Sequence, residues 1–341
     1  MKMKYLALAL VVVSCKSEDD APLGGSLTVA GSVRDFATDG EIAGTASVST
    51  TALVPAPRIT VEGSSFTLDG VPENSAFQIL ASVAPTHRGT YSPALEVTTD
   101  DVDGVKAYAL SEQFLGTLAS GFSITPSAAK GVLLLHLVDG AGNPKAGVSG
   151  SNLVLANVQG ATGPKFLDDA LRPVSSLTAT SSSGWAVFFE VPTGVVSLGV
   201  AANATVTLQM ATSPVGAGTV TIANVVVADG APPPLPTNVS FSQTVFPIFT
   251  NRGCVACHSG NGPGRDLGGL TLDGSANLVY KELTQENPLR ANPTNPEGSL
   301  VLTMPSAESP SDGHPNVTFT GPQDPDYLKI LVWLREGAKS N

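Results

Sequence analysis

Three side chains able to ligate a metal or carry thiol chemistry lie within five residues: Cys254, Cys257 and His258, in the string GCVACHSG. The chain of 341 residues contains only three cysteines and four histidines, so this segment holds a large share of both. Thiolates and imidazoles ligate soft transition metals, and paired thiols also exchange disulfides. The segment is therefore the first place to look for the chemistry of this chain.

Two cysteines separated by two residues serve three kinds of chemistry. A redox-active pair usually starts a helix that follows a strand, whereas the residues before Gly253 have helical periodicity. A structural zinc site needs about four ligands. Cys254, Cys257, His258 and His314 would supply them without a second closely spaced pair. In the third kind, both thiols bind the vinyl groups of one haem, and the adjacent histidine ligates the iron.

The amino terminus indicates export, which favours haem because covalent haem is attached outside the cytoplasm. Two lysines precede an apolar run, Tyr5–Val13, that is too short to span a bilayer. The run ends in VVSC, which resembles a bacterial lipobox, so residues 1–14 are predicted to be a lipoprotein signal peptide. The resemblance implies that Cys15 is acylated and that residues 15–25 form an acidic tether. An ordinary secretory signal with an incidental cysteine is the alternative.

The predicted location is the cell envelope, where the lipid would anchor the exported protein in the outer membrane, facing the periplasm or the surface. The net charge of −11 is spread along the chain, and no basic stripe could follow a phosphate backbone. Binding to nucleic acid is therefore not expected. The chain is long enough for two or three domains.

Two stretches, residues 26–116 and 128–228, repeat the same order of signals. Each begins with an apolar strand that ends in aspartate, Asp35 and then Asp139, followed by a turn and an Ala-Gly pair. Later in each stretch, SSFTLDGVP is echoed by GWAVFFEVP. The pattern resembles the carboxypeptidase-regulatory-like (transthyretin-like) β-sandwich. This resemblance implies two sandwiches that serve as spacers or binding modules without catalysis.

The sequence pattern changes from strand-like to helical after a Pro-rich linker at residues 229–238. Apolar residues then recur at helical spacing, directly after the linker and again near the end, so residues 239–341 are predicted to be helical. Asp324 is expected to cap the last helix, with Pro325 in its first turn and Gly337 ending it.

The segment from Ser240 to Ala338 resembles the cytochrome c-like modules of exported bacterial multidomain proteins. FSQTVFPIFTNRGCVACH looks like their first helix and haem-attachment turn, and LGGLTLDGS like the loop after the haem. NPTNPEGSLVL looks like a loop into a short helix capped by Ser299, and DPDYLKILVWLREGA like the closing helix. The predicted fold class is therefore two all-β sandwiches followed by an all-α cytochrome c-like domain.

This resemblance implies one covalent haem c, held by Cys254 and Cys257, with His258 as the proximal iron ligand. The distal ligand is predicted to be His314, with Met304 as the alternative. Family members often carry a Met-Pro pair shortly before the closing helix, whereas Met304-Pro305 stands well upstream of it. His314, in the string SDGHPNV, lies ten residues before Asp324. A solvated loop histidine is the simpler interpretation of His314.

Other residues receive plainer interpretations. Arg252 and Arg290 are expected to be solvated rather than bound to haem propionates. His87 is expected in a surface turn, and His136 is expected to be a core or edge histidine bonded to a neighbour. The aromatic residues of the helical segment are expected to be core residues that could also wall a haem: Phe246, Phe249, Tyr280, Phe319, Tyr327 and Trp333.

The sequence as a whole predicts a membrane-tethered c-type cytochrome that exchanges electrons with a redox partner protein and uses its sandwiches as a stalk. The alternative is that the sandwiches bind a cell-envelope polymer or protein and the haem domain is a redox-responsive accessory. An enzyme is not expected, because no nucleophile-base signature is present. The one enzymatic activity that the sequence does not exclude is a peroxidase-type activity at a single haem.

Overall fold

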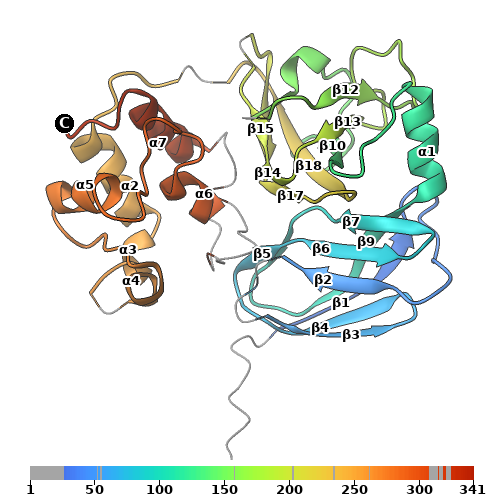
Figure 1. Cartoon of the computed structure of the whole chain (residues 1–341), viewed down its shortest axis with the longest axis horizontal. Coiled ribbons are helices and arrows are strands. Elements are labelled where there is room, and N and C mark those ends of the chain that lie inside the picture. Colours follow the sequence, from blue (N-terminus) through green and yellow to red (C-terminus); the bar gives the residue numbers. More distant parts are fainter. Residues whose placement is uncertain are drawn as a thin grey trace, which may run out of the picture.

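The computed structural model describes residues 27–341, apart from residues 52, 54, 55, 157, 202, 233, 234, 261, 307–313, 315–317 and 320–323. The predicted signal peptide, the acidic tether and Cys15 lie outside the described residues. The described chain forms a large mixed β-sheet region followed by a helical segment at its carboxyl end (Figure 1).

The first β block consists of β1 (Leu27–Asp35), β2 (Ser47–Thr50), β3 (Arg58–Glu62), β4 (Ser65–Val71), β5 (Ser75–Phe77), β6 (Ile79–Val83), β7 (His87–Tyr91), β8 (Leu95–Val97) and β9 (Val102–Ser111). Apolar side chains alternate with polar ones along these strands, so one face is buried. Val29 and Val33 of β1 and Phe66 and Leu68 of β4 are buried, as their spacing predicts.

The second β block follows helix α1 (Glu112–Gly121). It consists of β10 (Gly131–Val138), β11 (Val154–Leu155), β12 (Thr162–Phe166), β13 (Trp185–Val191), β14 (Gly194–Val196), β15 (Leu198–Gly199), β16 (Val206–Met210), β17 (Ser213–Val215) and β18 (Val220–Asp229), with a short 3-10 turn, η1 (Gly150–Asn152). Nearly every residue of β10 is buried, so both faces of this strand are covered.

The two blocks use the same pairing plan. Strand β1 lies between β4, which is antiparallel to it, and β9, which is parallel to it. Strand β10 likewise lies between antiparallel β13 and parallel β18. The aspartates at the end of each first strand, the last residue of β1 and the residue after β10, also match. Asp35 accepts a hydrogen bond from the Thr38 amide, and Asp139 accepts from the Ala141 and Asn143 amides. The repeat predicted from SSFTLDGVP and GWAVFFEVP thus coincides with β4 and β13.

The blocks are joined by pairing and by a common core. Strand β18 pairs in parallel with β7, matching Val220 to Thr90. A cluster of buried apolar residues, here called the shared core, draws from the first block, from α1 and from the second block. Its buried members are Phe36, Leu110, Leu115, Leu118, Ala119, Phe122, Val132, Leu134, Leu167, Val187, Phe189, Val220 and Ile222. Within the described residues the two blocks therefore do not have fully separate interiors.

The helical segment has a core of its own, formed by residues between Val239 and Ala338. Its elements are a π-type turn η2 (Phe241–Val245), α2 (Phe246–Asn251), α3 (Cys254–Cys257), α4 (Pro263–Gly268), α5 (Ala276–Thr284), α6 (Leu300–Ser306) and α7 (Pro325–Arg335). Figure 1 shows these elements, in orange to red, gathered to one side of the strands. Trp333 on α7 is completely buried in this core.

Helix α7 begins and ends as predicted. The Asp324 side chain accepts hydrogen bonds from the Asp326 and Tyr327 amides, Pro325 is the first helical residue, and Gly337 adopts φ 95° after the last turn. Ser299 is a different case. It precedes α6, but its hydroxyl accepts from the Asn292 amide and so holds the preceding loop instead of capping the helix.

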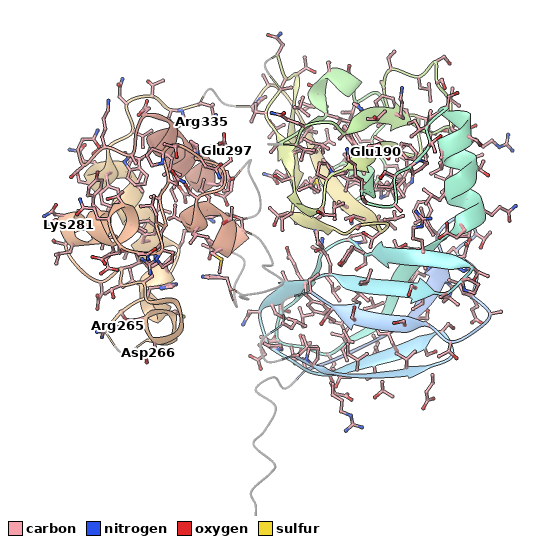
Figure 2. The ribbon with its side chains drawn as sticks, in the orientation of Figure 1. Glu190, Arg265, Asp266, Lys281, Glu297 and Arg335 are labelled. Carbon is pink, nitrogen blue, oxygen red and sulfur yellow. The ribbon has the colours of Figure 1, made fainter. Side chains whose placement is uncertain are left out.

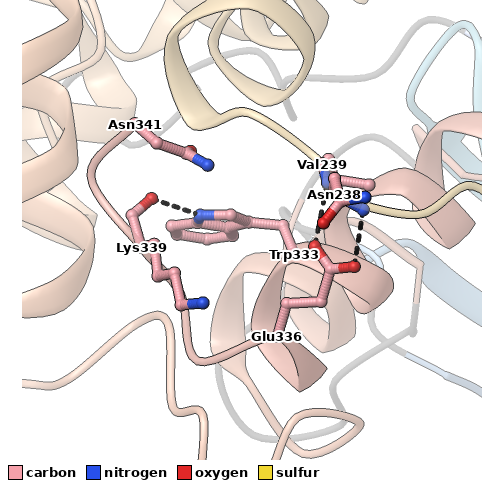
Figure 3. Close-up of a pocket in the computed structure, with 6 residues that line it drawn as sticks. All are labelled: Asn238, Val239, Trp333, Glu336, Lys339 and Asn341. Carbon is pink, nitrogen blue, oxygen red and sulfur yellow. Dashed lines mark hydrogen bonds between the residues drawn. The ribbon is translucent and has the colours of Figure 1, made fainter.

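The end of the chain closes back on the start of the helical segment (Figure 3). Glu336 accepts hydrogen bonds from the amides of Asn238 (2.7 Å) and Val239 (2.8 Å), and the Trp333 indole donates to the Lys339 carbonyl at 2.9 Å. These residues surround a small hollow of about 220 Å³. Arg335 of α7 also binds Glu297 (Figure 2), which ties α7 to the loop before α6.

Candidate functional site

The two cysteines lie on a single helical turn that starts abruptly after α2. Helix α2 ends at Asn251, and Gly253 adopts φ 73°, a left-handed conformation that glycine tolerates without strain. This residue starts α3, so Cys254 and Cys257 are placed one turn apart. Both cysteines are half-buried and neither is in a disulfide. The turn can therefore present two thiols to one bound group.

His258 directly follows α3, and its ring is held by a loop farther along the chain. Nδ1 lies 3.1 Å from the Leu270 carbonyl, and the Leu272 amide donates to the His258 carbonyl at 2.6 Å. Because a carbonyl only accepts, Nδ1 carries the proton, and Nε2 is left with the lone pair that binds metals. Gly264 of α4 permits this position, since a Cβ there would come within 2.7 Å of the ring.

His314 lies next to His258 in space. The two imidazole rings are nearly parallel, with 13° between their planes and 6.1 Å between their centres. Both this pair and the pair of His136 with Trp185 are stacked, but the latter has its centres only 4.4 Å apart. Two imidazoles that share one metal ion have centres up to about 6 Å apart. Each metal–nitrogen bond is about 2 Å, and each ring centre lies about 1 Å farther. Met304 lies within α6, half-buried.

The surroundings of Cys254 do not favour a redox-active thiol pair. Burial raises the pKa of the Cys254 thiol above its usual value of 9.0, although Arg252 acts in the opposite direction. Reactive thiols have a lowered pKa instead. Among the described residues, no group of three or more His, Cys, Asp or Glu side chains is arranged to hold a metal ion by itself.

Two arginines predicted to be solvated are instead held by nearby acceptors, although 28% of the Arg252 side chain stays exposed. Arg252 donates to Asp324 at 2.7 Å and to Asp326 at 2.8 Å, and its guanidinium lies 5.7 Å from the centre of the Phe319 ring. Arg290 is only 6% exposed, and its donors contact backbone carbonyls. Sequence periodicity gives no sign of such long-range acceptors.

The aromatic residues of the helical segment are core residues, as predicted. Phe249, Phe319, Tyr327 and Trp333 are buried, and Tyr280 packs against the same core. Burial raises the pKa of Tyr327 to about 12, with a further contribution from Glu297, so its phenol is neutral at ordinary pH.

The remaining histidines lie in the β region. His136 packs on Trp185 in the second block, and burial lowers its pKa, although its hydrogen bond to Asn224 acts in the opposite direction. This agrees with the predicted histidine bonded to a neighbour. His87 starts β7 and is more enclosed than a surface turn residue, because Nε2 lies 3.1 Å from the Asp35 carboxylate.

A cleft next to His87 was not evident from the sequence. It has a volume of about 570 Å³ and is formed by the loop after β1, the β6–β7 turn and the first turns of α1. Its lining residues are Asp35, Ala37, Thr38, Glu41, Ile42, Ala43, Thr86, His87, Ser111, Gln113, Phe114 and Thr117. The sequence feature that could have pointed to this cleft is the aspartate repeated at the end of each first strand. The sequence does not show that α1 lies beside Asp35, because only the fold brings them together.

Comparisons with known proteins give a distant structural likeness and no family. Neither a protein-family model nor a curated protein matches the chain. The Streptococcal ancillary pilin is 10% identical over 59% of this chain and 68% of its own, with a TM-score of 0.18. The shaft pilin SpaA from Lactobacillus rhamnosus GG is 11% identical over 61% of this chain and 100% of its own, also at 0.18. At these scores the likeness carries no argument here.

The longest helix of the described residues is α7, with 11 residues. None of their helices combines the length and the apolar character needed to cross a bilayer.

Proposed function

We propose that this chain is an exported c-type cytochrome that transfers electrons through one covalently bound haem. The observation that carries the proposal is the environment of His258. Its Nδ1 is bound by the Leu270 carbonyl, and its ring is parallel to that of His314 at 6.1 Å, directly after a turn that presents two thiols. This set of donors suits an iron porphyrin attached by thioethers.

Each residue of the site then has a defined part. Cys254 and Cys257 would hold the haem by thioethers, His258 would ligate the iron through Nε2, and His314 would be the second protein ligand in preference to Met304. When bound, the haem supplies one-electron exchange. With His258 and His314 both bound to the iron, the haem would exchange electrons and would not carry out bond chemistry. Ligation by two histidines places the reduction potential below that of a His/Met cytochrome.

The remaining parts of the proposal concern the whole chain. The β region would be a stalk of two sandwich domains at residues 26–116 and 128–228, and residues 239–341 would be the cytochrome c-like domain. A lipid on Cys15 would tether the protein to the cell envelope, where a redox partner protein would deliver or accept electrons. The separate core of the helical segment and its proline-containing connection to β18 support such a division.

The test is purification of the exported chain from a bacterium that matures c-type haem. We expect a coloured protein whose haem survives acid-acetone extraction and denaturing gels, and whose reduced-minus-oxidised spectrum is that of a low-spin c-type haem. Cys257→Ala should lose most of the haem, while Ser259→Ala, two residues along, should keep it. A colourless protein with stoichiometric zinc would contradict the proposal.

A second function is favoured by the cleft in the first β block. Exposed hydrogen-bonding side chains, among them Glu41, Thr86 and Gln113, lie around half-buried Phe114. Polar groups beside an aromatic surface suit a sugar unit of an envelope polysaccharide. We expect co-sedimentation with isolated peptidoglycan that Gln113→Ala weakens. Glu62→Ala, an exposed change on β3, should have no effect. Equal sedimentation of the three proteins would exclude the cleft as the site.

A further inference from the structure

Arg290 is a buried cation that binds only backbone carbonyls among its described contacts. Nη2 donates to Gly268 at 3.1 Å and to Gly269 at 2.9 Å. Nη1 contacts the carbonyls of Glu282 at 3.3 Å and Pro288 at 3.4 Å. None of the ion pairs formed by the described residues includes Arg290. Its charge is therefore balanced by peptide dipoles.

The position of these carbonyls explains why an arginine is found here. Gly268 is the last residue of α4, Gly269 follows it, and Glu282 lies in the last turn of α5. The carbonyls at a helix end have no partner within the helix and carry partial negative charge. A guanidinium has donors on a rigid planar fork and can bind two such ends at once. Arg290 therefore connects the ends of α4 and α5.

The same connection leads to His258 through two independent contacts. Gly268 is a near neighbour of the His258 ring, since a Cβ built on it would be 4.0 Å from the ring Cε1 atom. Gly269 is bonded to Leu270, whose carbonyl accepts the hydrogen bond from Nδ1. Arg290 thus fixes the two residues that immediately precede the group orienting this imidazole.

We infer that Arg290 is a positioning residue for His258 and also supplies a buried positive charge that favours the reduced iron. The inference rests on the proposed function. One electron delivered by a donor protein would lower the positive charge held at this site by one. A nearby fixed cation stabilises the state with less positive charge, because it is repelled less. The protein thereby partly offsets the low potential that two histidine ligands give.

Two substitutions in the haem-loaded full-length protein separate charge from position. Arg290→Gln removes the charge and keeps an amide donor. Its potential, measured by spectroelectrochemistry, should fall by an amount equal to about a tenfold shift of the redox equilibrium, which is about 59 mV for one electron. Arg290→Lys keeps the charge and loses the planar fork. Its potential should stay close to the original value, while the ferric low-spin EPR signals shift because the His258 ring is less constrained.

Arg335→Gln is the matched control, since it removes an exposed arginine of the same segment that binds Glu297. It should change neither the potential nor the EPR signals. An unchanged potential in Arg290→Gln would overturn the charge effect, and unchanged EPR signals in Arg290→Lys would overturn the positioning role. If Arg290→Gln does not fold, the charge effect is tested with Arg290→Lys alone. A fall of about 59 mV in the potential of this variant, which keeps the charge, would overturn the charge effect. An unsubstituted protein without haem would instead contradict the proposed function.

Discussion

The Nδ1 atom of His258 is held by a backbone carbonyl, an arrangement that is common in histidines that bind metals. The sequence showed the histidine beside the cysteines but not the Leu270 carbonyl, which is twelve residues away and reaches it only through the turn of α4. The hydrogen bond selects the tautomer and leaves Nε2 for a metal. At this scale the candidate ligand could be named from the motif, whereas the orientation of its ring depends on a loop.

Gly264 offers a direct test of that orientation. Gly264→Ala places a methyl group within 2.7 Å of the His258 ring, so either the ring or the backbone of α4 must shift. We expect less covalent haem and a loss of about 1–3 kcal/mol in the free energy of unfolding, as for other overpacked sites. Gly268→Ala is the control in the same helix, because its methyl group would lie at an ordinary 4.0 Å from the ring. Equal haem content in both variants would contradict the prediction.

The distal ligand is tested by comparing His314 with Met304. His314→Ala should convert the ferric haem from low spin to high spin, because the ring parallel to His258 is removed. Met304→Leu should leave the absorption spectrum nearly unchanged, since the substitution keeps volume and apolar character in α6. A sulfur-to-iron charge-transfer band in the unsubstituted protein that disappears in Met304→Leu would reverse the assignment.

Among the elements, those with a local signal could be predicted and those fixed by distant partners could not. The caps of α7 are local, and Asp324, Pro325 and Gly337 behave as predicted. Ser299 had the right type for a cap, but the loop at Asn292 competes for its hydroxyl. Arg252 was expected in solvent, because nothing near it in the sequence shows that the start of α7 lies beside it.

The ion pair between Arg252 and Asp326 predicts that α7 loses stability in acid. Burial acts to raise the pKa of Asp326, but hydrogen bonds from Lys329 and Arg252 outweigh it and hold the pKa below 3.8. A lowered carboxylate pKa adds stability that is complete above the unfolded value and is lost as pH falls through the folded value. At neutral pH, Asp326→Asn should therefore unfold at a lower urea concentration than the original protein. The difference between the two urea midpoints should shrink below about pH 3.8.

Asp103→Asn serves as the comparison for that titration, because it removes an exposed carboxylate on β9. Its unfolding curve should follow that of the original protein at each pH. A difference between Asp326→Asn and the original protein that is constant from neutral pH to strong acid would show that the ion pair does not titrate as described.

The whole molecule combines a predictable repeat with an interface that no local pattern reveals. The order of strand, aspartate and turn in each block could be read from the sequence, and β1 and β10 do share one pairing plan. The parallel contact of β18 with β7 and the position of α1 join residues more than a hundred positions apart. Such pairs follow from shape and burial in three dimensions, so the sequence predicted two units without their common interior.

The shared core predicts that the second block is not self-sufficient. A fragment of residues 128–228 exposes one side of this core, including Leu134, Val187 and Ile222, which lose Leu110 and α1 as partners. Each fully buried apolar side chain contributes about 1.5–3 kcal/mol, so we expect this fragment to bind a hydrophobic dye, to associate and to unfold without a sharp transition. Residues 27–229 should be monomeric and unfold cooperatively, and residues 108–228, which regain Leu110 and α1, should be intermediate. A sharp transition of residues 128–228 at the same temperature as residues 27–229 would show that the blocks are independent.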